Sequence, residues 1–315
     1  MGRVIGKQVN VSRRADLQML LATVIWGSSY LFMKSGLESM QELNLVAFRF
    51  SIAFIAAAII FHRRLFRMDL KALGAGTIMG TALFAAFVLI TYGVQRTTTS
   101  QAGFLISLAV IFVPILSTIL HRRMPDTRLM ISIIVAVAGL GLLTLQHELS
   151  LHTGDVLCIL AALTYAIYIM IAGRYIPRHD PLTLGTIQLG VAALWGIAAT
   201  FLFESPQLPD SPESWVAILG LGVLCSGIGY ILQTLAQRHA SPTRTSLIFS
   251  LEPLFAAAFA FSFQGETLTL QGYTGAALML LGVLITEIKS LDVRYWRRKR
   301  ATLPADLGEQ GASGI

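Results

Sequence analysis

The sequence contains little charge. Only 13% of its 315 residues are Asp, Glu, Lys or Arg, against roughly 25% in soluble domains. Hydrophobic residues account for 55% of the chain, and the mean hydropathy is +0.68. This composition excludes an ordinary soluble domain and predicts an integral membrane protein.

Cysteine is nearly absent as well. The two cysteines, Cys158 and Cys225, lie in apolar stretches, so we expect buried thiols and no disulfide or metal framework. The chain also lacks the HExxH, GxSxG and P-loop patterns, which argues against metalloproteases, α/β-hydrolases and a nucleotide site on this chain. We therefore predict no enzyme activity, no catalytic or metal-binding residue and no cofactor.

One short motif resembles an enzyme signature. His121 and Asp126 form H-x4-D, a pattern of membrane acyltransferases in which an acid orients a histidine base. Both residues lie in a tight loop between apolar stretches, without room for the rest of an acyl-donor site. An intramembrane enzyme is therefore the third-ranked hypothesis.

Apolar stretches long enough to cross the roughly 30 Å hydrocarbon core recur along the chain. The predicted fold class is an all-α integral membrane protein with ten transmembrane helices. The expected spans are residues 16–35, 44–61, 72–92, 100–120, 129–147, 154–174, 182–203, 214–236, 243–263 and 271–289.

The distribution of basic residues predicts the orientation. With the N-terminus inside, most of the 24 Lys and Arg residues fall near cytoplasmic span ends; Lys34 and Arg96 fall outside, and Arg49 falls within the second span. Because Lys and Arg are retained on the cytoplasmic side, we expect both termini in the cytoplasm and a multi-pass protein of the cell membrane. This asymmetry explains the net charge of +7 without a nucleic-acid partner. The basic loops and the run from Arg297 to Arg300 are predicted to contact anionic lipids.

The spans contain a repeat. One offset between the two halves of the chain places the aromatic Trp26 on the aromatic Tyr165, and a slightly larger offset aligns the fourth span with the ninth. An odd number of spans in each half makes the second half run through the membrane upside down, as in secondary transporters whose site lies near the midplane between inverted repeats. The pairs aligned by the larger offset are Ser107 with Ser250, Leu108 with Leu251, Phe112 with Phe255, and Gly139 with Gly282.

Several segments resemble the EamA-type carriers of the drug/metabolite transporter superfamily. These are ATVIWGSSY, AFRF, GDVLCILAALTYAIY and SLEPLFAAAFA, and TTTSQAGFLISLAVIFVPIL resembles one subgroup. The resemblance covers about residues 16–290. It implies two inverted five-helix repeats around a central cavity, at residues 16–147 and 154–289, and export or exchange of small metabolites, often amino acids or amines. We expect residues 1–15 to be a cytoplasmic tail and the basic residues 290–315 to be a disordered cytoplasmic tail.

The ninth span carries Glu252 and Pro253 near its midpoint. A carboxylate at the bilayer centre costs about 2.5–3.5 kcal/mol and needs a cavity, a partner or a proton, and a proline interrupts the helix. Glu252 is predicted either to contact substrate or a proton, or to stabilise a structural break. The first repeat has Ala109 and Val110 instead, with its proline later. We therefore expect that the two halves do not contribute equivalent site groups, and that Pro114 and Pro253 are gating or helix-break positions.

Aromatic and amide side chains supply the other candidates for substrate binding. Trp26 and Tyr165 are predicted to face each other across the cavity, where aromatic faces bind ammonium groups; simple packing is the alternative. Arg49 is a possible clamp for an anion, or it extends to the outer interface. The residues predicted to bind substrate are Trp26, Tyr30, Tyr165, Tyr168, Gln188, Tyr230 and Glu252.

These observations predict a secondary transporter that moves small metabolites, such as amino acids or amines, by alternating access. Its partners would be the small-molecule substrate and the lipid bilayer. The alternative is a membrane scaffold or sensor without transport activity, whose interior is filled by side chains. The oligomeric state, the substrate, the direction and proton coupling stay open.

Overall fold

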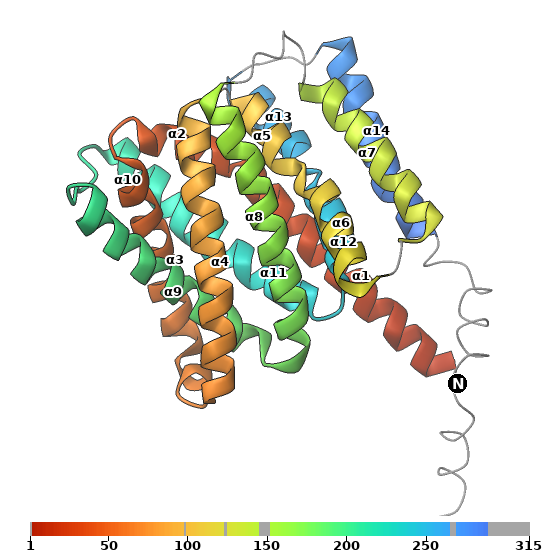
Figure 1. The fold of residues 1–315 in the computed structure, drawn as a ribbon, viewed down its shortest axis with the longest axis horizontal. Helices are drawn as coiled ribbons and strands as arrows, with labels where there is room; N and C mark the ends of the chain where they lie inside the picture. Colours follow the sequence, from red (N-terminus) through yellow and green to blue (C-terminus); the bar gives the residue numbers. More distant parts are fainter. Residues whose placement is uncertain (1, 98, 123–124, 145–151, 265–268, 289–315) are drawn as a thin grey trace, which may run out of the picture.

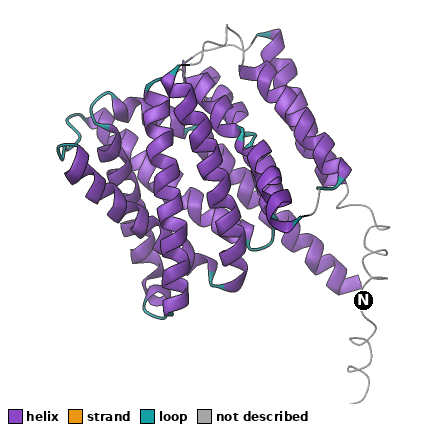
Figure 2. Cartoon of the chain, in the orientation of Figure 1, coloured by secondary structure: helices purple, strands orange, loops and turns teal. Residues whose placement is uncertain are grey.

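The computed structural model describes residues 2–97, 99–122, 125–144, 152–264 and 269–288. Within these ranges all regular secondary structure is helical (Figure 2). The predicted tail at residues 290–315, with its run from Arg297 to Arg300, lies outside the described residues. The prediction of an all-helical chain is confirmed.

The helices follow the predicted spans, but four of those spans, the first, fourth, eighth and ninth, are interrupted. The first helix begins inside the stretch expected to be a tail. In chain order the helices are α1 (Gly2–Gly27), α2 (Ser29–Leu37), α3 (Glu42–Leu65), α4 (Leu70–Gln95), α5 (Thr99–Ser107), α6 (Ala109–His121), α7 (Thr127–Thr144), α8 (Thr153–Tyr175), the short 3₁₀ helix η1 (Ile176–Arg178), α9 (Pro181–Phe203), α10 (Pro212–Leu219), the π-helix η2 (Gly220–Ile228), α11 (Gly229–Gln237), α12 (Pro242–Phe249), α13 (Glu252–Gln264) and α14 (Leu270–Ile288).

Length and hydropathy identify the helices able to cross a membrane. Among the described residues six helices meet both criteria, and two apolar helices, Thr127–Leu143 and Leu270–Ile285, are shorter. A multi-pass membrane protein is therefore supported, while the count of ten spans stays a prediction. The six are Glu42–Leu65, Leu70–Gln95, Ala102–His121, Thr153–Arg178, Pro181–Phe203 and Pro212–Gln237.

The fourth and ninth spans break at the same place in the repeat. The Leu108 N–H donates to the Leu105 carbonyl over 3.3 Å, and the Leu251 N–H donates to the Ile248 carbonyl over 3.1 Å. These two hydrogen bonds are equivalent in the alignment of the fourth span with the ninth. Each joins residues three apart, so a tighter turn interrupts the α-helical ladder in both repeats.

Pro114 does not explain the break in the first repeat. Pro114 is buried inside α6, well after the break at Leu108. Pro253 is the second residue of α13, in the first helical turn, where the missing N–H of proline has little cost. The first repeat breaks in the same way without a Glu-Pro pair, so a break at this place does not require one. A gating or helix-break role for either proline stays a prediction.

Helices α7 and α14 pack closely at one side of the bundle (Figure 1). A Cβ atom on Gly139 would lie 2.6 Å from the Gly275 carbonyl oxygen, and one on Gly282 would lie 2.8 Å from the Ser132 carbonyl oxygen. The alignment of the two repeats exchanges these contacts, since it places Gly139 on Gly282 and Ser132 on Gly275. Such exchange is expected when a two-fold axis relates two elements.

Gly139→Ala should lower the stability of the protein by about 1–3 kcal/mol, because the new methyl group meets backbone atoms that cannot rotate away. Thermal unfolding in detergent measures this as a lower midpoint than that of the wild type. Gly74→Ala on α4 is the matched control, because a Cβ there has nothing within 4 Å. Equal midpoints for the two variants would contradict the close packing of α7 on α14.

Candidate functional site

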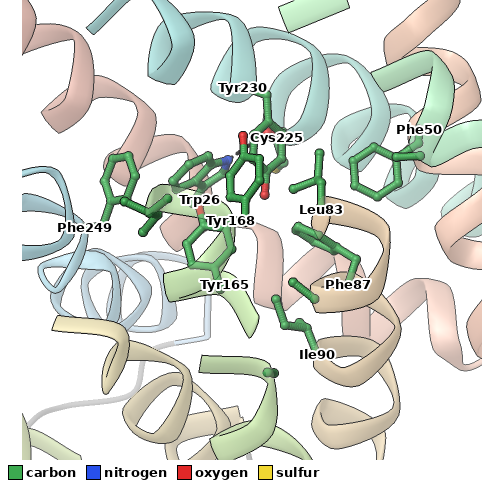
Figure 3. Close-up of a cluster of buried hydrophobic side chains, with 14 of the residues drawn as sticks. Trp26, Phe50, Leu83, Phe87, Ile90, Tyr165, Tyr168, Cys225, Tyr230 and Phe249 are labelled. Carbon is green, nitrogen blue, oxygen red and sulfur yellow. Dashed lines mark hydrogen bonds between the residues drawn. The ribbon is translucent and has the colours of Figure 1, made fainter. Parts of the chain in front are cut away.

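Trp26 is the centre of a buried aromatic cluster (Figure 3). Its ring centroid lies 4.8 Å from that of Phe249, 5.1 Å from that of Tyr230 and 6.5 Å from that of Tyr165. The rings of Trp26 and Tyr165 meet edge to face, with an interplanar angle of 77°. The structure therefore brings together the two aromatics that the repeat relates.

The π-helix η2 anchors the indole of Trp26. The indole Nε1 donates to the Cys225 carbonyl over 2.8 Å, and Cys225 lies in the middle of η2. The next helix begins with Gly229, where a Cβ atom would come within 2.5 Å of the indole nitrogen. A glycine is therefore required at this position for α1 to approach the second repeat so closely.

The predicted tyrosines and Gln188 share this interior. The rings of Tyr165 and Tyr168 stack with centroids 5.5 Å apart, and the Tyr168 hydroxyl donates to Gln188 Oε1 over 3.0 Å. Tyr230 is 1% exposed, and its ring centroid lies 6.2 Å from that of Tyr168. Gln188 Nε2 is buried and has no acceptor among the described residues. A polar ligand or a water molecule would satisfy this donor.

Arg49 points into the bundle. Its side chain is 1% exposed, and its Nε donates to Ser226 Oγ of η2 over 2.9 Å. The guanidinium carbon lies 4.3 Å from the centre of the Phe87 ring and 5.4 Å from that of Phe50. An extended side chain at the outer interface, the alternative considered from the sequence, is therefore wrong, because ring faces and a hydroxyl hold the guanidinium in the interior.

Glu252 faces the same interior from the second repeat. The Tyr30 hydroxyl lies beside its carboxylate, which also interacts electrostatically with Arg49. Glu252 is partly accessible although Tyr30 and Arg49 are buried. The adjacent Pro253 lies near Gly103 of α5, so the start of α13 packs against the first repeat beside this carboxylate.

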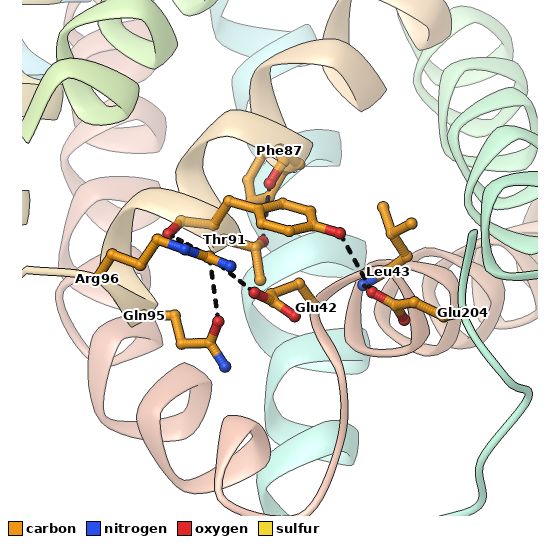
Figure 4. A network of polar contacts seen from close by, with 8 residues as sticks. Glu42, Leu43, Phe87, Thr91, Gln95, Arg96 and Glu204 are labelled. Carbon is orange, nitrogen blue, oxygen red and sulfur yellow. Dashed lines mark hydrogen bonds and ion pairs between the residues drawn. The ribbon is translucent and has the colours of Figure 1, made fainter. Parts of the chain in front are cut away.

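A second polar network lies at one end of the bundle (Figure 4). Arg96 forms a 2.8 Å ion pair with Glu42, and the Tyr92 hydroxyl lies 3.4 Å from Glu204. The Glu204 carboxylate accepts hydrogen bonds from the backbone N–H groups of Leu43 and Asn44, over 2.9 and 3.0 Å. These N–H groups belong to the first turn of α3, where no carbonyl of the same helix can accept from them. Glu204 at the end of α9 therefore caps a helix of the other repeat.

Three hydrogen-bond partners were not predicted from the sequence: Ser226 for Arg49, the Cys225 carbonyl for Trp26, and Glu204 for the start of α3. A signal was present for Glu204, because Glu42, Arg96 and Glu204 all lie at the ends of predicted spans on the side poor in basic residues. No comparable signal marked Ser226, a single hydroxyl in an apolar stretch.

The last two kinds of site to consider are a metal site and the H-x4-D motif at His121. Among the described residues no group of three or more His, Cys, Asp or Glu side chains is arranged to hold a metal ion. His121 is exposed, and its Nδ1 lies 3.0 Å from the Ser117 carbonyl of its own helix.

Apolar helices that enclose an arginine, a glutamate and several aromatic hydroxyl or indole groups define a multi-pass membrane protein with a polar interior, the architecture of a membrane transporter. The chain belongs to the EamA-like transporter family, whose model matches residues 13–145 and again residues 152–288. The family places it in the drug/metabolite transporter superfamily. The two matches establish a two-repeat architecture, and they confirm the family resemblance noted in the sequence.

Relatives agree with this assignment. Two proteins of Archaeoglobus fulgidus, both named uncharacterized transporter, are 26% and 28% identical and align with 89% and 87% of this chain and with 99% and 86% of their own. A probable terminal-alkyne amino-acid exporter of Streptantibioticus cattleyicolor is 25% identical over 92% of this chain and 98% of its own. A solved crystal structure shares the fold, with a TM-score of 0.74 and 16% identity over 88% of this chain and 97% of that chain. The family and the named relatives are transporters and not enzymes, so the acyltransferase hypothesis for His121 is dropped.

Proposed function

We propose that the protein is a secondary transporter that exports or exchanges small metabolites, such as amino acids or amines, by alternating access. The observation that carries this proposal is the placement of Arg49, Glu252 and the aromatic cluster in one interior between the two repeats, with Arg49 and Glu252 within electrostatic reach of each other. Groups of opposite charge and aromatic faces suit small polar substrates that carry an ammonium group. The terminal-alkyne amino-acid exporter among the relatives is consistent with this substrate class.

In this proposal the two repeats form ten spans of opposite orientation. The exchanged contacts between α7 and α14 support a two-fold relation between the repeats, and the matching breaks at Leu108 and Leu251 support the same relation. The repeats would rock about the interior site, which lies between them. Both termini would be cytoplasmic in the cell membrane, with basic loops against anionic lipids.

Counterflow in liposomes tests the transport function. Purified protein should exchange a radiolabelled amino acid or amine against an internal pool of the same compound without ATP. Glu252→Gln should reduce the initial rate by about 10-fold or more, because it removes a charge from the proposed site. Glu213→Gln on the exposed first turn of α10 is the matched control and should leave the rate unchanged. The absence of counterflow for every amino acid, amine and related metabolite tried would refute the proposal.

A membrane scaffold or sensor is the second candidate. The observation in its favour is the close packing of the aromatic cluster, whose Trp26, Tyr168 and Tyr230 side chains are 5%, 0% and 1% exposed. A scaffold needs no mobile interior, so it predicts that Glu252→Gln and the wild type behave alike in every assay. A transport defect in this variant, with an unchanged thermal midpoint, separates the two candidates.

A further inference from the structure

We propose that Arg49 and Glu252 form a pair of opposite charges that recognises the two charges of a zwitterionic substrate, with Arg49 on the carboxylate and Glu252 on the ammonium group. This inference rests on the proposed transport function and specifies its substrate requirement. Arg49 belongs to α3 in the first repeat and Glu252 to α13 in the second, so a bound zwitterion would connect the two repeats.

The Arg49 guanidinium has donors available for a carboxylate. Among the described residues its single hydrogen bond runs from Nε to Ser226 Oγ over 2.9 Å, although a guanidinium carries five N–H donors. The rings of Phe87 and Phe50 pack against the guanidinium and, together with Ser226, fix its orientation. A fork of nitrogen donors held in this way matches the two oxygens of a carboxylate.

The Glu252 carboxylate has the complementary properties. The Tyr30 hydroxyl lies beside it, and an ionised carboxylate has several acceptor positions. Glu252 is partly accessible in an interior where Tyr30 and Tyr165 are buried. The rings of Trp26 and Tyr165, which form a T-shaped pair nearby, add aromatic surface suited to an ammonium group.

Charge balance explains why both groups of the substrate are needed. The two side chains interact with each other electrostatically. A zwitterion brings one charge of each sign and leaves both side chains matched. A simple amine would leave Arg49 without a counter-charge, and a simple carboxylic acid would leave Glu252 without one, at the high cost of an unpaired charge in a low-dielectric interior.

Competition with matched analogues tests this inference. The amino acid that gives the fastest counterflow in wild-type protein is labelled, and three unlabelled competitors are compared: the amino acid itself, its decarboxylated amine and its deaminated acid. Each analogue should compete about 10-fold to 100-fold more weakly than the amino acid, because it lacks one charge-assisted contact. Arg49→Gln should remove the preference for the amino acid over the amine. Glu252→Gln should remove its preference over the acid.

The controls separate this inference from the transport function. Arg96→Gln removes a charge from the network at the end of the bundle and should leave both preferences intact. If Arg49→Gln fails to fold, Ser226→Ala, which removes the partner of Nε without changing charge, should weaken the preference over the amine. Wild-type counterflow in which the amine or the acid competes as well as the amino acid would overturn the two-charge site while leaving transport standing. No counterflow for any compound would overturn the proposed function.

Discussion

Trp26→Ala should lower the free energy of unfolding by about 3–5 kcal/mol, as expected when a large buried aromatic side chain is removed. The indole touches rings from three other helices, on Tyr165, Tyr230 and Phe249, and donates a hydrogen bond to the Cys225 carbonyl. Its removal would leave a void where the two repeats meet. Differential scanning calorimetry in detergent measures the loss without relying on tryptophan fluorescence.

Two further variants separate the contributions to this effect. Trp26→Phe keeps a ring and loses the indole N–H, so it should cost about 1–3 kcal/mol for the unsatisfied carbonyl and the reduced volume. Trp215→Ala is the control, because Trp215 is 41% exposed and makes a single described ring contact, with Phe48. A Trp26→Ala protein as stable as the Trp215→Ala protein would show that the cluster does not hold the repeats together.

Glu204→Ala should lower the free energy of unfolding by about 2–4 kcal/mol, because it removes a helix cap and leaves N–H groups at the start of α3 without an acceptor. The carboxylate bonds the N–H groups of Leu43 and Asn44, and it also accepts from the Asn44 side chain over 2.8 Å. Because Glu204 belongs to the second repeat and α3 to the first, the same change should loosen the contact between repeats at this end of the bundle.

Cysteine labelling measures this loosening. Thr91 is fully buried beside the network (Figure 4), so a Thr91→Cys side chain should react slowly with a maleimide when Cys158 and Cys225 are replaced by Ala. Adding Glu204→Ala should speed the reaction by at least about 10-fold, which corresponds to about 1.4 kcal/mol in the opening equilibrium. Arg64→Gln is the control, since it breaks an ion pair with Asp180 whose side chains are 52% and 36% exposed, and such pairs contribute little. Equal labelling rates with and without Glu204 would contradict the idea that this network holds the two repeats together at this end of the bundle.

The candidate site was predictable from the sequence to the extent that its residues are unusual for a membrane span. Glu252 and Arg49 are charged residues in apolar stretches, and Trp26 and Tyr165 are related by the repeat; the structure brings all four into one interior. The alternative position of Arg49 at the interface could not be rejected from the sequence, because a long side chain near a span end can turn either way.

The break positions show where reasoning from one residue type is insufficient. Proline marks places where a helix is able to break, and Pro114 and Pro253 were therefore expected at the breaks. The turns centre on Leu108, six residues before Pro114, and on Leu251, two residues before Pro253. At both positions a hydrogen bond between residues three apart interrupts the α-helical ladder, and α5 packs on α13.

Hydropathy along the chain was sufficient for the membrane class and the helical fold, because the bilayer imposes length and polarity on each segment separately, and the resemblance of several segments to EamA-type carriers indicated the family. The contacts that make the site depend on segments far apart in the chain. Trp26 meets Cys225 across 199 positions, and Arg49 meets Ser226 across 177. Which donors of Arg49 are occupied, and which carboxylate caps α3, follow from how those segments pack, and no local pattern contains that information.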